Sequence, residues 1–327
     1  MAVNFLSTFI LVLLPIIAGL LIISPFFSNN AIKIRRFAKA FCAFNLFYSI
    51  LFMLFMPCDV SGFAFVEQFP LNIMPNLNVS IVFGLDNVSA LLCVLSSFVM
   101  LLALIVSKSL INSRQKSFYS LMLFLLGAVF GIFAANNLFT FLTFWMLLLP
   151  PAYFLISIPG GNNTRKNAVK FVLFSFASSI LIMISTALVY AYCADLNILS
   201  DFGTLIKKSE DFPVVMQMMI CAGFSIAFAL RLPVFPLHSW LVEVHSEVPA
   251  PVSAVLAGIL LNTAAYGFIR INLQMYYDVF QLFAPVLILF AAIGVVWASC
   301  AAIAQNNIKK LVSCISLVNM GIILIGI

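Results

Sequence analysis

Apolar runs of close to twenty residues recur from one end of this chain to the other. An α-helix needs about 20 apolar residues to cross the hydrocarbon core of a bilayer. The composition fits this pattern, since 64% of the 327 residues are hydrophobic and only 8% are charged. Because backbone groups in lipid must be hydrogen-bonded internally, the pattern predicts an all-α, polytopic membrane helical bundle without a soluble domain.

About ten spans are predicted by this periodicity. The apolar stretch from Phe5 to Phe27 is too long for a signal peptide and no basic residue precedes it, so we expect a retained first span. The spans are expected near residues 4–27, 37–57, 86–107, 117–135, 138–158, 168–192, 214–241, 251–270, 279–303 and 310–327.

Basic residues fall on alternate connections between these spans, as the positive-inside rule requires. This places the amino terminus outside and explains the net charge of +6 without a nucleic-acid partner. All ten carboxylates fall in loops or at helix ends, so no acid is available mid-span as a proton relay. The basic residues of the inner side are Lys33, Arg35, Arg36, Lys39, Lys108, Arg114, Lys116, Arg165, Lys166, Lys170, Lys309 and Lys310.

The seventh span is interrupted by the sequence RLPVFPLH, residues 231–238. Pro233 and Pro236 lack backbone donors and clash with the preceding turn. The freed carbonyls are tolerated at membrane depth only where protein or water satisfies them, as at the ion and substrate sites of transporters. We therefore predict that residues 214–241 form two half-helices joined by an unwound, hydrated elbow, with the Arg231 guanidinium at the joint.

Two other spans carry irregular residues. Pro150 and Pro151 predict a kink in the fifth span, as a packing device or as part of a site. In the eighth span, small residues such as Gly258 and Gly267 predict the close approach of another helix. Asn262 lies on the same span, and its buried amide needs hydrogen-bond partners.

Two segments, RLPVFPLHSWLVEVHSEVPAP (231–251) and AGILLNTAAYGFIR (257–270), resemble the signature of the antiporter-like membrane subunits of respiratory complex I. The chain M type, called subunit 4 in mitochondria, is the most similar. Residues 139–157, 165–171 and 305–321 resemble further family segments in the same order. The resemblance extends from about Asp86 to the last residue.

The resemblance implies three leading helices followed by two inverted five-helix repeats. We accordingly expect the leading helices in residues 1–110, the first repeat with its broken helix 214–241 in residues 111–275, and the start of the second repeat in residues 276–327. The second repeat is cut short, which predicts a fragment, a split gene product or a truncated subunit.

Several family positions are changed in this divergent chain. In the family, a Glu–Lys pair is thought to gate proton uptake, and Lys and His carry the proton along the central axis. Arginine keeps the charge of lysine but does not release its proton near neutral pH, and methionine and asparagine do not titrate there. The changes are Met146 for Glu, Arg231 and Asn262 for Lys, Asn319 for His, and Val242-Glu243 for Pro-Asp.

Two titratable groups remain near the expected axis, namely Lys170 and His238, and His245 lies just beyond them. His238 is the strongest candidate for a proton carrier. The alternative is that His238 anchors the helix break by hydrogen-bonding a freed carbonyl. The candidate ion path therefore comprises Arg231, His238, Lys170, Asn262, Asn319 and His245.

Three functions fit this pattern. The first is a subunit of a proton-translocating NADH-quinone oxidoreductase that couples quinone reduction on partner chains to ion movement, in a bacterial or mitochondrial inner membrane. The second is a subunit of a sodium–proton antiporter complex or membrane-bound hydrogenase, and the third is a non-conducting structural subunit. The Leu-His-x-Trp motif followed by Leu-Asn-x-x-x-Tyr-Gly favours the first. The changed positions predict poor proton conduction, or conduction by a water path around Arg231.

No cofactor is expected on this chain. The sequence lacks a Gly-rich phosphate loop after a strand, a Cys cluster for iron–sulfur and a His pair at haem-like spacing. We therefore expect no metal and no catalytic chemistry on this chain alone. On the resemblance, NADH, quinone, FMN and iron–sulfur clusters belong to partner subunits, and the partners are other membrane subunits of the same complex.

Overall fold

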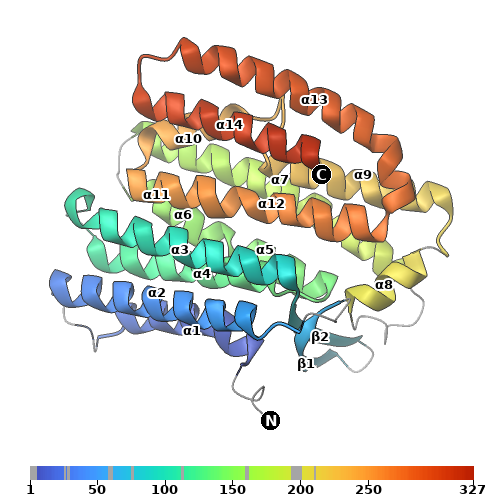
Figure 1. Cartoon of the computed structure of the whole chain (residues 1–327), viewed down its shortest axis with the longest axis horizontal. Helices are drawn as coiled ribbons and strands as arrows, with labels where there is room; N and C mark the ends of the chain where they lie inside the picture. Colours follow the sequence, from blue (N-terminus) through green and yellow to red (C-terminus); the bar gives the residue numbers. More distant parts are fainter. Residues whose placement is uncertain are drawn as a thin grey trace. The chain divides into compact units, whose positions relative to one another are not determined.

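The computed structural model describes residues 6–25, 27, 30–57, 62–74, 77–111, 114–158, 162–192, 201–209 and 211–327. These residues are mostly helical (Figure 1). They fall into two compact units that are described separately. Unit 1 comprises Met1–Ile158, Leu196–Gly203 and Pro249–Ile259, and unit 2 comprises Pro159–Asp195, Thr204–Val248 and Leu260–Ile327.

Unit 1 contains the leading helices, a β-hairpin and a helix pair. Polar residues start several of these helices. For example, Asp86 Oδ1 accepts from the Ser89 amide at 2.9 Å, and the Ser89 hydroxyl oxygen accepts from the Asp86 amide at 2.7 Å, which forms a capping box. The elements are α1 (Thr8–Ile23), α2 (Ala31–Leu54), β1 (Ala64–Met74), β2 (Leu77–Leu85), α3 (Asn87–Leu110), α4 (Gln115–Phe133), α5 (Leu138–Leu147), α6 (Leu149–Ser157) and α11 (Ala250–Val255).

Unit 2 contains the broken helix and the last two long helices. The π-helical segment Leu256–Leu260, which belongs to unit 1 up to Ile259, precedes α12 in the eighth span. A second π-helical segment, Phe268–Leu273, follows α12 within unit 2. The sequence did not predict the short helix α8, whose first two residues belong to unit 1 and the rest to unit 2. The helices are α7 (Asn162–Tyr192), α8 (Phe202–Ser209), α9 (Val214–Arg231), α10 (Ser239–Glu247), α12 (Leu261–Gly267), α13 (Tyr277–Ile303) and α14 (Ile308–Gly326).

Nine helical stretches among the described residues are long and apolar enough to cross a bilayer. Helix α1 is equally apolar but has only 16 residues, and it lies within the first predicted span. The spans correspond one by one to those predicted from the sequence. The predicted all-α membrane bundle is confirmed.

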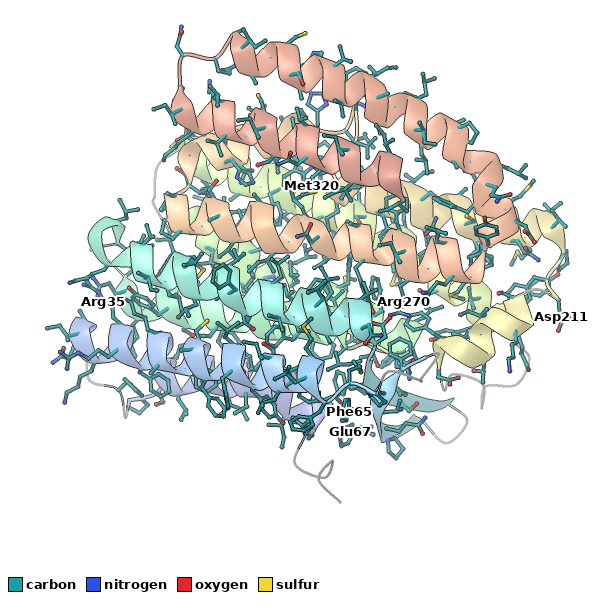
Figure 2. The ribbon with its side chains drawn as sticks, viewed as in Figure 1. Arg35, Phe65, Glu67, Asp211, Arg270 and Met320 are labelled. Atoms are coloured by element: carbon teal, nitrogen blue, oxygen red, sulfur yellow. The ribbon has the colours of Figure 1, made fainter. Side chains whose placement is uncertain are left out.

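The β-hairpin is the main element that the apolar pattern missed. Its strands pair antiparallel, with Glu67 opposite Phe83. Glu67 is labelled beside the hairpin in Figure 2. Glu67 Oε2 accepts hydrogen bonds from Ser7 Oγ and from the Phe9 amide, both at 3.0 Å. Amides at a helix N-terminus lack intrahelical partners and favour negative charge, so this carboxylate stabilises the start of α1.

The kink predicted in the fifth span is present. The structure divides this span at Leu148 into α5 and α6, and the prolines stand in the first turn of α6. Missing amide donors cost little there, because first-turn amides have no intrahelical partner. Residues 159–161, whose sequence Pro-Gly-Gly predicts a sharp turn at the end of this span, lie outside the described residues.

The small-residue face predicted for the eighth span is confirmed in each unit. A Cβ atom on Gly258 would lie 3.2 Å from Val99 Cγ1, within unit 1. A Cβ atom on Gly267 would lie 2.5 Å from the Phe228 ring, within unit 2. Phe228 is itself confined, because its ring contacts Phe224 and Phe268. Glycine at position 267 therefore allows α12 to pack closely on α9.

We expect Gly267→Ala to lower the free energy of unfolding by about 1–3 kcal/mol, the usual cost of overpacking a core. The measurement is thermal unfolding of the purified chain in detergent. Gly326→Ala is the matched control, since a Cβ there meets nothing within 4 Å. Equal melting temperatures for both variants would show that the α9–α12 contact is not tight.

Candidate functional site

The predicted helix break is present in unit 2. Helix α9 ends at Arg231 and α10 begins at Ser239, with the non-helical residues 232–238 between them. The second half-helix continues to Glu247, beyond the predicted end of the span at residue 241. Glu243 therefore lies within α10, although the sequence predicted that the broken helix ends at residue 241 and that Glu243 follows it.

The backbone groups freed by the break have partners within unit 2. Pro233 cannot donate to the carbonyl of Ala229, and the Val234 amide donates to it instead at 3.2 Å. The Leu230 carbonyl accepts a hydrogen bond from the indole Nε1 of Trp240 at 3.2 Å. Trp240 is 2% exposed, so this bond joins the two half-helices inside the protein. The anchoring role considered for His238 thus belongs to Trp240.

Arg231 occupies the joint of the broken helix, as predicted. Its side chain is 1% exposed and stands in the last turn of α9. The C-terminus of a helix carries partial negative charge, which favours a cation there. A buried arginine still costs about 2.5–3.5 kcal/mol on membrane-insertion scales. Arg231 is therefore a fixed positive charge held at depth within unit 2.

His238 stands at the other end of the elbow, directly before α10. Its ring stacks on Phe235 at 5.4 Å and lies 4.2 Å from the ring of Trp297 on α13. Its Nδ1 atom is buried and has no hydrogen-bond partner in the part of the chain that the structure describes. A cavity of about 10 Å³ adjoins the ring, lined also by Leu232 and Gly294. By this measure roughly 10–15 Å³ holds one water molecule, so the cavity is at the limit for a single water.

Lys170 forms an ion pair that the sequence did not reveal. Its Nζ lies 2.7 Å from Glu243 Oε1, which joins α7 to α10. The side chains are 32% and 49% exposed, respectively. Asn167 Nδ2 adds a hydrogen bond to the Glu243 carbonyl at 3.0 Å. Exposed pairs of this kind contribute only about 0–1 kcal/mol, so the pair contributes little to stability.

The remaining candidates have different environments. His245 is 2% exposed on α10. At the end of this helix, the Val248 carbonyl accepts a hydrogen bond of 3.1 Å from Lys309 Nζ. Asn262 is half-buried on α12, and Asn319 is on the exposed face of α14. Unit 2 thus contains all six candidates for the ion path. Met146 is half-buried on α5, which belongs to unit 1.

One polar cluster was missed by the sequence reasoning. Asn272, fully buried in the second π-helical segment, donates from Nδ2 to Ser225 Oγ at 2.6 Å and to the Cys221 carbonyl at 3.3 Å. It joins the eighth span to α9. The only sequence signal is the amide of Asn272 between the apolar residues Ile271 and Leu273. Among the described residues, no group of three His, Cys, Asp or Glu could hold a metal ion.

Together, these features define a multi-pass membrane protein with a discontinuous helix that has a buried cation at its break. Residues 135–327 match the family described as NADH:quinone oxidoreductase/Mrp antiporter, transmembrane. The chain belongs to this family, which confirms the resemblance inferred from residues 231–270.

Individual relatives agree with this assignment. The chain is 34% identical over 318 residues to NAD(P)H-quinone oxidoreductase chain 4 3 of Trichormus variabilis, covering 97% of this chain and 58% of the relative. Its fold is similar to that of a chain in respiratory complex I from Thermus thermophilus, with a TM-score of 0.85, 24% identity, and coverage of 97% and 63%. A chain of the Mrp complex from Dietzia sp. gives a TM-score of 0.81, 16% identity, and coverage of 98% and 33%. The chain thus spans little more than half the length of the Trichormus relative.

We expect Trp240→Phe to destabilise the elbow by about 1–3 kcal/mol, because it leaves the buried Leu230 carbonyl without its donor. The aromatic contact of residue 240 with Phe171 is retained in this variant. The measurements are thermal unfolding and amide hydrogen exchange across residues 228–241.

Trp145→Phe is the control, since it makes the same change on α5 in unit 1. Faster exchange at the elbow should occur only in Trp240→Phe. Unchanged exchange in that variant would show that the indole does not stabilise the break.

Proposed function

We propose that this chain is a membrane subunit of a proton-translocating NADH-quinone oxidoreductase, where it couples quinone reduction on partner chains to ion movement. The observation that supports this most is the broken helix with Arg231 buried at its joint. Burying a charged side chain such as Arg231 in a membrane span costs free energy, and such residues commonly mark ion pathways. Family membership and the relative named as NAD(P)H-quinone oxidoreductase chain 4 point the same way.

The proposed path uses groups of unit 2 with different roles. Lys170, paired with Glu243 at a partly exposed position, marks the proposed entrance of the path. His238, beside its small cavity, is the internal carrier, because imidazole titrates near neutral pH. Arg231 does not carry the proton and acts instead by its charge. Asn262, Asn319 and His245 are the positions proposed to hold water or to complete the path.

Water must complete this path around Arg231. Moving one charge against 100 mV requires about 2.3 kcal/mol, which the chain receives from reactions on its partners. A nearby positive charge disfavours a second one, so Arg231 would raise the energy of a proton passing close to it. We propose that this charge makes conduction slow, and that His238 and water bypass it.

The assembly follows from the same proposal. NADH, FMN, quinone and iron–sulfur clusters would be held by partner subunits, and this chain would contact other membrane subunits in a bacterial or mitochondrial inner membrane. The amino terminus would lie outside, as the distribution of basic residues indicates. The division into leading helices (1–110), first repeat (111–275) and start of the second repeat (276–327) also remains a proposal.

Two alternatives have specific support. The structural similarity to a chain of the Mrp complex supports a subunit of an antiporter complex. The loss of titratable groups at Met146, Asn262 and Asn319 supports a structural subunit that does not conduct. A requirement for sodium would distinguish the antiporter subunit from the main proposal. Measurable proton uptake would distinguish the main proposal from the structural subunit.

The test is NADH-driven proton uptake by vesicles containing the chain with its partner subunits. We expect Arg231→Ala to raise uptake several-fold, because it removes the charge that slows conduction. Arg231→Lys should keep uptake within about twofold, because the charge is retained. Arg36→Ala is the control, since Arg36 is exposed on α2. Wild-type uptake no greater than in vesicles without the chain would favour the structural role, and a strict sodium requirement the antiporter role.

The ion pair gives a second test of the same path. We expect Lys170→Met to lower uptake several-fold while the melting temperature changes little, because an exposed pair contributes at most about 1 kcal/mol. Lys166→Met removes an exposed lysine from the same helix and should leave uptake unchanged. If both variants behave alike, the Lys170–Glu243 pair is not part of the path.

A further inference from the structure

A groove of about 360 Å³ opens in unit 1. It lies between the end of α1, the start of α4 and the end of α6. Ligand sites commonly measure about 300–1,000 Å³, so the groove is large enough for part of a small molecule. Its walls are chemically divided, with Arg114, Ser117 and Ser157 on the polar side and Ile23, Leu121 and Phe154 on the apolar side.

Arg114 is the charged group of this groove. It is exposed, stands at the N-cap of α4 with φ of 50°, and its side chain does not cap the helix. A left-handed backbone is unusual for a residue other than glycine, and a cation is unfavourable beside the positive end of a helix. An anion in the groove would relieve this repulsion by binding both the guanidinium and the helix end.

The other polar groups near the groove are already engaged. Lys116 Nζ donates to the carbonyls of Ser24 at 3.0 Å and Phe27 at 3.1 Å, which satisfies the end of α1. Ser157 Oγ donates to the Tyr153 carbonyl at 2.8 Å. Arg114 and Ser117 are therefore the donors left for a ligand, and both belong to the start of α4.

The apolar wall points to a ligand with a hydrocarbon part. Ile23 and Phe154 are 52% and 53% exposed in the groove. The end of α1 and the starts of α2 and α4 lie at the same end of unit 1 (Figure 1), and Arg35 of α2 is labelled at this end in Figure 2. Basic residues gather there, as expected at the inner surface of a membrane, where anionic lipids bind between helices.

We propose that this groove binds one anionic phospholipid. The phosphate lies against the Arg114 guanidinium and the Ser117 hydroxyl at the start of α4. One acyl chain follows Ile23, Leu121 and Phe154 into the hydrocarbon region. The negative charge of the headgroup complements Arg114, and the apolar wall distinguishes a lipid from a soluble phosphate.

The experiment is native mass spectrometry of the purified chain in detergent, titrated with phosphatidylglycerol or with phosphatidylcholine carrying the same acyl chains. We expect wild type to bind phosphatidylglycerol at least fivefold more tightly than phosphatidylcholine. Arg114→Gln should reduce this preference to less than twofold, and Arg114→Lys should retain most of it. Phe154→Ala should weaken the binding of both lipids.

Arg36→Gln is the matched control, since it removes an exposed arginine of the same unit that does not line the groove. Equal loss of preference in Arg36→Gln and Arg114→Gln would assign the binding to general surface charge and overturn the proposal. Glycerol phosphate, which has no acyl chain, should not displace the lipid at equal concentration. Displacement by it would show a phosphate site and not a lipid site.

A variant that fills the groove keeps the test independent of Arg114. Ser117→Trp places a large ring at an exposed position and should exclude both lipids without changing the melting temperature. Lipid binding equal to that of wild type in this variant would contradict the assigned location.

Discussion

Within unit 2, the rest of the site depends on one constraint, namely that backbone freed by a break inside a membrane must be hydrogen-bonded by the protein or by water. Because Pro233 has no amide donor, the Val234 amide donates to the Ala229 carbonyl. The Leu230 carbonyl then accepts its hydrogen bond from the indole of Trp240. Because Trp240 belongs to α10, the same bond fixes where the second half-helix begins. The positions of His238 and Glu243 follow from that start.

A cationic side chain lies at the C-terminal end of each half-helix. Arg231 stands in the last turn of α9, and Lys309 donates to the Val248 carbonyl at the end of α10. Each places positive charge where the aligned peptide dipoles are negative. The two cations nevertheless differ in use, since Arg231 is buried at the elbow while Lys309 ties α14 to α10. Helix ends therefore help to stabilise a charge that the apolar surroundings alone would disfavour.

Much of the bundle was predictable from the sequence because membrane spans obey a simple length rule. The breaks at Arg231–His238 and Pro150 were predictable because proline has a local effect on the backbone. The hairpin was not, since its strands lie in a connection between apolar runs. The Trp240 bond and the Lys170–Glu243 pair were missed because they join residues distant along the chain or across the elbow. Periodicity carries no information on such contacts.

The two π-helical segments that flank Asn262 have a consequence for the eighth span. A π turn closes hydrogen bonds five residues apart, so it contains one residue more than an α turn. Straightening one segment into regular α-helix would rotate everything beyond it by about 100° around the helix axis. That rotation is large enough to exchange the face on which the Asn262 amide lies. Each π segment thus holds one more residue in the eighth span than a regular α turn would.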